Sequence, residues 1–108
     1  MIYELRVYTA APDKMSDVLS RFRDHTVKLF EQHGIKNIGY WVNGIGGRND
    51  ELIYILAYDS IEQRETAWAN FRSDPEWQRV LTESNIDGNI VHHTTNQILM
   101  PTDFSPLT

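Results

Sequence analysis

Residues Ile53–Trp77, IYILAYDSIEQRETAWANFRSDPEW, decide the fold of this chain. Their first part is an apolar run to Tyr58 that has the length and composition of a strand. Ser60, with Gln63 three residues later, is the capping-box pattern that starts a helix. Asp74 followed by proline predicts the start of a further short helix. We therefore expect a strand, a helix and a second, shorter helix in this order.

Three further strands and one long helix are predicted around this stretch. The strands are expected at residues 2–9, 36–43 and 90–100. Between the first two, apolar side chains recur every three or four residues from Lys14 to His33, which indicates a helix that ends at Gly34. The charged side of this helix, expected to lie opposite its apolar stripe, consists of Asp17, Arg21, Asp24 and Lys28.

The order strand, helix, strand, strand, helix, strand is typical of an α+β, ferredoxin-like βαββαβ fold. Right-handed crossovers would place the first and third strands in the middle of a four-stranded antiparallel sheet. We expect one ferredoxin-like domain over residues 1–100 and a polar C-terminal tail over residues 101–108.

The first and third strands also predict a homodimer. The third strand, residues 52–58, is apolar on both faces, yet two helices cover only one face of such a sheet. An exposed apolar sheet face is rare on a monomer, so a second copy is expected to pack on it. On the first strand the face of Tyr3, Leu5 and Val7 is predicted to be the core face, and the opposite face carries Ile2, Glu4, Arg6 and Tyr8.

Composition excludes several classes of function. The net charge of −5 and the scattered basic residues argue against nucleic acid as a partner. The absence of cysteine excludes disulfides and thiolate chemistry. No apolar run has the length of a membrane span, and a strand pattern begins at Ile2, so we expect no targeting segment and a cytoplasmic location.

Four short motifs in order resemble the NIPSNAP family. They are MIYELRVY at residues 1–8, GYW at 39–41, AYDS at 57–60 and DPEW at 74–77. The resemblance implies a dimeric α+β barrel, in which two ferredoxin-like subunits join their sheets. It also relates the chain to cofactor-independent monooxygenases, haem-degrading enzymes and muconolactone-isomerase-like proteins, whose ligands often lie between the sheet and the helices.

Arg6 is the centre of the predicted ligand site. Glu4 and Arg6 are two apart on one strand, so their side chains point the same way. Such a pair is more often a structural ion pair, and the alternative is a partly buried arginine, held by Glu4, that binds a carboxylate, carbonyl or phenolate. The predicted ligand-binding residues are Arg6, Tyr8, Tyr40, Tyr54 and His93, and the supporting residues are Glu4, His25, Trp41 and Trp68.

The histidine spacing predicts no metal site. His92 and His93 are adjacent on a strand and point to opposite faces, and His25 and His33 are more than two helical turns apart. A single histidine, His93 or His25, is a candidate acid or base, and simple hydrogen bonding is the alternative. Aromatic residues at these spacings more often fill the core, and lining a ligand cleft is the alternative.

Two functions are therefore compatible with the sequence. The first is a homodimeric small-molecule-binding or interaction module without turnover. The alternative is a cofactor-independent monooxygenase-like or isomerase-like enzyme that acts on an apolar or aromatic small molecule. No cofactor is predicted for either function.

Overall fold

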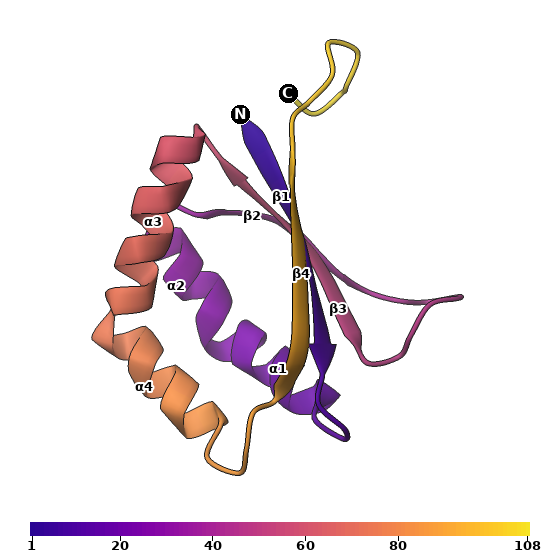
Figure 1. Ribbon diagram of the computed structural model, residues 1–108, viewed down its shortest axis with the longest axis vertical. Helices are drawn as coiled ribbons and strands as arrows, with labels where there is room; N and C mark the ends of the chain where they lie inside the picture. Colours follow the sequence, from indigo (N-terminus) through magenta and orange to yellow (C-terminus); the bar gives the residue numbers. More distant parts are fainter.

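The computed structural model describes all residues, 1–108, and consists of one sheet with a layer of helices (Figure 1). The long first helix is continuous but contains a π-helical turn, labelled η1. The elements are β1 (Ile2–Ala10), α1 (Met15–Arg21), η1 (Phe22–Thr26), α2 (Val27–Gln32), β2 (Lys36–Val42), β3 (Glu51–Tyr58), α3 (Ile61–Ser73), α4 (Pro75–Ser84) and β4 (Val91–Leu99).

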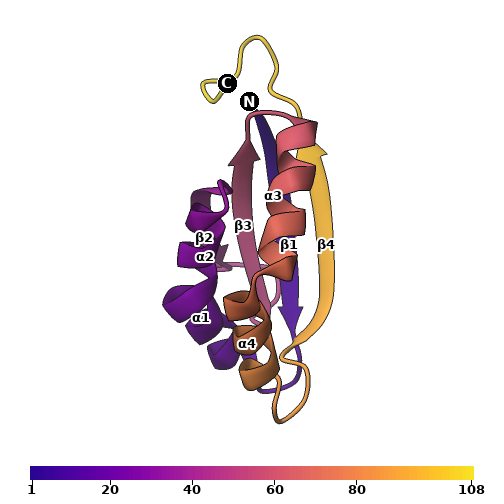
Figure 2. The same ribbon diagram turned by 90° about the vertical axis from the view of Figure 1, so that its left-hand side faces the viewer.

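The sheet is antiparallel, with strand order β2-β3-β1-β4, and all helices lie on one face of it (Figures 1 and 2). The predicted α+β, ferredoxin-like fold is confirmed, with β1 and β3 in the middle. Both caps are also confirmed. Ser60 Oγ accepts a hydrogen bond from the Gln63 backbone N–H at 3.0 Å, and Asp74 Oδ1 accepts one from the Glu76 backbone N–H at 2.8 Å.

The prediction for the core face of β1 is wrong. Glu4 pairs with Leu56 of β3, and Arg6 pairs with Tyr54, so these four side chains share the face under the helices. On that face Tyr54 and Leu56 are fully buried, as is Glu4. Charged groups occupy this core face because they bond to one another there, which a count of apolar residues along one strand does not reveal.

Arg21 is also placed differently from the prediction. It ends α1, immediately before the π-helical turn, and is buried instead of facing solvent. The extra residue of a π-helical turn leaves a backbone carbonyl without its usual partner, and here Thr26 Oγ1 donates to the Arg21 carbonyl oxygen at 3.3 Å. α4 packs against this side of the helix and covers Arg21.

The other face of the sheet carries no helix. Its central side chains include Val7 of β1, which pairs with Ile53 of β3, and both are only partly buried. Trp41 of β2 is half exposed and folds over Gly39, where an added Cβ would lie 2.5 Å from the indole ring. The tail after β4 returns to this region, and Thr108 accepts a hydrogen bond from the Tyr3 hydroxyl at 3.3 Å.

No helix combines the length and the apolar composition that crossing a membrane requires.

Substitution of Gly34 tests the predicted end of the long helix. Its φ of +78° lies in the left-handed region, so Gly34→Ala is expected to lower the free energy of unfolding by about 1 kcal/mol in urea denaturation. Gly44→Ala is the control, because its new methyl group meets nothing within 4 Å, and it should change stability by less than about 0.5 kcal/mol. Equal stability of the two variants would contradict the role of Gly34 as a helix cap.

Candidate functional site

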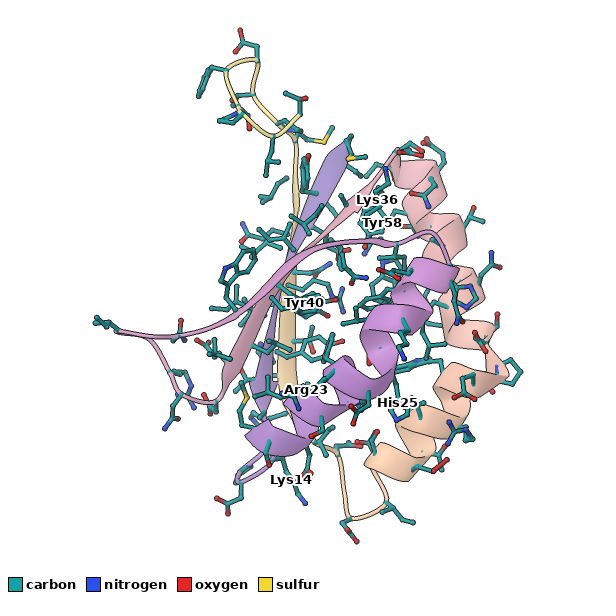
Figure 3. All side chains as sticks on the ribbon, turned by 180° about the vertical axis from the view of Figure 1, so that it is seen from behind. Lys14, Arg23, His25, Lys36, Tyr40 and Tyr58 are labelled. Carbon is teal, nitrogen blue, oxygen red and sulfur yellow. The ribbon has the colours of Figure 1, made fainter.

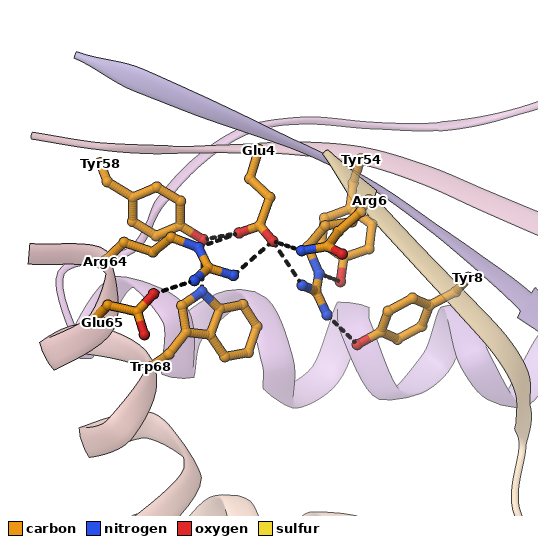
Figure 4. Close-up of polar contacts among 9 residues, drawn as sticks. Glu4, Arg6, Tyr8, Tyr54, Tyr58, Arg64, Glu65 and Trp68 are labelled. Atoms are coloured by element: carbon orange, nitrogen blue, oxygen red, sulfur yellow. Dashed lines mark hydrogen bonds and ion pairs between the residues drawn. The ribbon is translucent and has the colours of Figure 1, made fainter. Parts of the chain in front are cut away.

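Glu4, near the start of β1, is a fully buried carboxylate that accepts five hydrogen bonds (Figure 4). Oε1 accepts from the Tyr58 hydroxyl at 2.6 Å and from Arg64 Nε at 3.1 Å. Oε2 accepts from Arg6 Nη1 at 3.0 Å, Arg64 Nη2 at 3.0 Å and Asn96 Nδ2 at 2.8 Å. The network therefore joins β1, β3, α3 and β4.

These contacts keep Glu4 ionised. Burial by itself raises the pKa of a carboxyl group, but here the hydrogen bonds from Arg64, Tyr58 and Asn96 and the charge of Arg6 outweigh it. Together they lower the pKa of Glu4 from 4.5 to about 2. Glu4 is thus a permanent anion near neutral pH and cannot act there as a general acid or base.

Arg6 is held on several sides of its guanidinium group. Nε donates to the Tyr54 hydroxyl at 2.8 Å, and Nη1 donates to Glu4. Nη2 has only the Tyr8 hydroxyl as a partner, at 3.5 Å, which is at the limit of a hydrogen bond. The guanidinium carbon lies 4.7 Å from the centre of the Trp68 ring, within the range of a cation–π contact.

The tyrosines beside Arg6 are neutral phenols in a packed aromatic cluster. Tyr40 stacks on Tyr54 with ring centres 5.1 Å apart, and the ring of Tyr8 meets that of Tyr54 edge to face. Burial raises the pKa of Tyr54 well above its usual value, and burial likewise raises the pKa of Tyr40 and of Tyr58. None of these three hydroxyls supplies a phenolate near neutral pH.

The structure brings together six of the nine residues predicted for the site and places three elsewhere. Glu4, Arg6, Tyr8, Tyr40, Tyr54 and Trp68 lie on the helix side of the sheet. His93 pairs with Thr9, the neighbour of Tyr8 on β1, so it points to the open face. Trp41 lies on that open face too, and His25 lines a groove between the long helix and α4 (Figure 3).

Sequence reasoning missed Arg64 and Asn96. Arg64 reaches Glu4 from the first turn of α3, and Asn96 reaches it from β4, 92 positions along the chain. Only the pairing register of β1 with β4, in which Arg6 lies opposite Asn96, identifies the second contact. The available signal was Glu4 itself, because a buried carboxylate needs more hydrogen-bond donors than one neighbouring arginine supplies.

The three main hollows of the surface lie away from this network. The largest of three, about 630 Å³, lies where the loop after β1 meets the β2–β3 hairpin, and its lining includes Asp13, Arg48 and His92. None of the three is lined by Arg6 or Tyr40. No three His, Asp or Glu side chains converge in a way suited to a metal ion.

Glu4 is expected to couple stability to pH. Its folded-state pKa of about 2 lies below its ordinary 4.5, so it contributes roughly 3 kcal/mol above pH 4.5, and this contribution is lost as the pH falls from 4.5 to 2. Glu4→Gln should lower the free energy of unfolding at pH 7 by about 3–5 kcal/mol, because it leaves two partly buried arginines without their anion. Urea denaturation between pH 7 and pH 2 measures both effects.

Glu65→Gln is the control for this variant, since Glu65 bonds Arg64 at 2.5 Å but is largely exposed. It should cost no more than about 1 kcal/mol. If Glu4→Gln were as stable as the wild type at pH 7, the network would not hold the fold together.

Comparison with known proteins agrees with this architecture. The family model described as NIPSNAP matches residues 3–106. Mouse NipSnap homolog 3B is 34% identical over 76 residues, which are 70% of this chain but only 30% of that protein. This chain thus spans less than a third of the length of that relative.

Solved structures show the same fold. A NIPSNAP family protein from Agrobacterium tumefaciens superposes with a TM-score of 0.87 at 29% identity, covering 99% of this chain and 98% of the other. An antibiotic biosynthesis monooxygenase superposes with a TM-score of 0.57 at 13% identity, covering 94% and 99%, and this likeness concerns the fold alone. The resemblance drawn from the four sequence motifs is confirmed: the chain belongs to the NIPSNAP family.

Proposed function

We propose that this NIPSNAP domain is a homodimeric small-molecule-binding module whose ligand places an oxygen on Arg6. The observation that carries the proposal is the uneven use of the Arg6 donors. Nε and Nη1 are fixed by Tyr54 and Glu4, whereas Nη2 has one long contact, to Tyr8 at 3.5 Å. An ordered guanidinium with one weakly used nitrogen is a preorganised donor for a carboxylate, carbonyl or phenolate oxygen.

The surroundings of Arg6 favour an apolar or aromatic ligand. The rings of Tyr8 and Trp68 lie 5.7 and 4.7 Å from its guanidinium carbon, and the Arg6 side chain keeps 12% of its surface exposed. β4 forms the edge of the sheet beside this position, and the side chains of Thr94 and Asn96 are exposed there. None of the three main hollows is lined by Arg6, so a ligand would reach Arg6 over this edge of the sheet.

Binding is favoured over turnover because the network lacks a group that titrates near neutral pH. Acid–base catalysis is most efficient when the catalytic pKa lies near the working pH. Glu4 has a pKa of about 2, and the pKa values of Tyr54 and Tyr58 are raised above that of an ordinary phenol. His25 and His93 lie outside the network.

The homodimer is proposed on the open sheet face. Val7, Ile53 and Ile55 form its centre; they are only partly buried, no helix covers them, and the C-terminal tail borders Ile55. A patch of this kind is stabilised when a second copy packs on it about a two-fold axis. The partner would then cover one face of the sheet while the helices cover the other.

Ligand binding is tested with Arg6→Lys. We expect benzoate or 1-naphthoate to raise the melting temperature of the wild-type protein in a thermal-shift titration. Arg6→Lys keeps the charge but loses the planar set of donors, so the dissociation constant should rise about tenfold or more. Arg72→Lys is the control, because Arg72 is exposed with its guanidinium 6.0 Å from the same Trp68 ring. Equal affinity of all three proteins would refute Arg6 as the anchor.

The homodimer is tested by light scattering. The wild-type protein should have twice the chain mass of 12.6 kDa at micromolar concentration. Ile55→Lys places a charge in the middle of the open face and should give the mass of one chain. Ile61→Lys introduces the same charge at an exposed position of α3 and should leave the dimer intact. A wild-type protein with the mass of a single chain would exclude the dimer.

A further inference from the structure

Arg21 is a buried cation that lacks an anionic partner. Only 7% of its surface is exposed. Nη1 donates to Ser84 Oγ at 3.2 Å, Nε is enclosed without any acceptor, and Nη2 has no acceptor in the chain. Arg6 and Arg64, in contrast, both bond to Glu4. A buried charge without a partner is costly, so Arg21 requires an explanation beyond packing.

Trp77 offers part of the compensation. The guanidinium carbon of Arg21 lies 5.5 Å from the centre of the Trp77 ring, within the range of a cation–π contact. The face of an indole attracts a cation, but it provides no oxygen for the N–H groups. Burial lowers the pKa of Arg21, although a guanidinium stays protonated at neutral pH. Nη2 therefore remains available to a ligand, whereas Nε is enclosed.

Arg21 lines a groove between the long helix and α4, which lie side by side at the lower end of the molecule (Figure 2). The groove has a volume of about 250 Å³, enough for a molecule of a few heavy atoms. Ser20 and Ser84 bring hydroxyl groups to it, and His25 brings an imidazole. The π-helical turn begins directly after Arg21, and such turns are frequent at functional sites.

The same groove contains an unpaired anion. Asp24 is exposed, three positions after Arg21, and no ion pair or hydrogen bond joins its carboxylate to another side chain. The other charged groups of the groove already have partners. Asp17 lies 3.9 Å from Lys14, and Glu83 is paired with Arg79. One cation and one anion are thus left facing the same hollow without meeting each other.

We propose that this groove binds a small amino carboxylate. Its carboxylate group would accept hydrogen bonds from Arg21 and Ser84, and its ammonium group would lie at Asp24. A simple anion fits less well, because Asp17, Asp24 and Glu83 surround the entrance with negative charge. A zwitterion matches both unpaired groups. The site uses none of the residues that contact Arg6, so each proposal can be tested without the other.

The test compares ligands with and without an amine in NMR titrations of the full chain. β-Alanine and 4-aminobutyrate are the amino carboxylates, and propionate and butyrate are their matched controls. We expect the amino carboxylates to shift the Arg21 Nε–H signal and the Ser84 amide signal in a saturable way. The plain carboxylates should bind about tenfold more weakly. Absence of saturable shifts with every probe, or equal binding of both classes, overturns the proposal.

Variants separate a binding role from a structural one. Arg21→Met should abolish binding and raise the melting temperature without ligand, because an apolar side chain replaces an unpaired buried charge. A lowered melting temperature would show that Arg21 holds the fold together and would overturn the proposal. Asp24→Asn, at an exposed position, should bind amino and plain carboxylates equally. Arg23→Gln, exposed on the same helix but outside the groove, should bind like the wild type (Figure 3).

Discussion

The rest of the structure depends on the burial of one carboxylate. Glu4 has no exposed surface and is surrounded by donors from β1, β3, α3 and β4. An ion of this kind is stable only if every lone pair is used, so the strand register and the position of α3 must be satisfied together. The requirement selects one arrangement of helix on sheet, since a shift of β1 by one residue would place Glu4 on the open face.

Burying the charge of an arginine is costly, and Arg6 and Arg21 differ in how their surroundings compensate for it. Arg6 is surrounded by an anion, two hydroxyls and an indole ring, and one of its nitrogens is only weakly engaged. Arg21 has a hydroxyl and an indole ring but no anion. The first arrangement pairs the charge with an anion, and the second leaves it without one. In both places the charged group is an arginine, which stays protonated at neutral pH, and not a group that titrates there.

The two faces of the sheet lie in different environments. The face with Tyr54 and Leu56 is buried by the chain's own helices, whereas the face with Val7 and Ile53 is half buried and apolar. The same central strands therefore form the core on one face and present a partly buried apolar surface on the other. Because the helices occupy only one side of the sheet, closing the core leaves the second face without a helix over it.

The sequence by itself determined the order of the elements, the two middle strands, the caps at Ser60 and Asp74 and the end of the long helix at Gly34. These are local properties: period, turn chemistry and capping depend on residues a few positions apart. The pairing of Glu4 and Arg6 could also be predicted, because residues two apart on a strand share a face.

Only the tertiary structure decided which face of β1 is the core face and which distant residues complete the site. Arg64 and Asn96 reach Glu4 across 60 and 92 positions, and Arg21 is buried because α4 packs over it. His93 and Trp41 point away from Arg6 because strand pairing fixes the side of the sheet on which each side chain lies. Burial of charge is a property of all the groups that surround it, and these groups come together only in the folded chain.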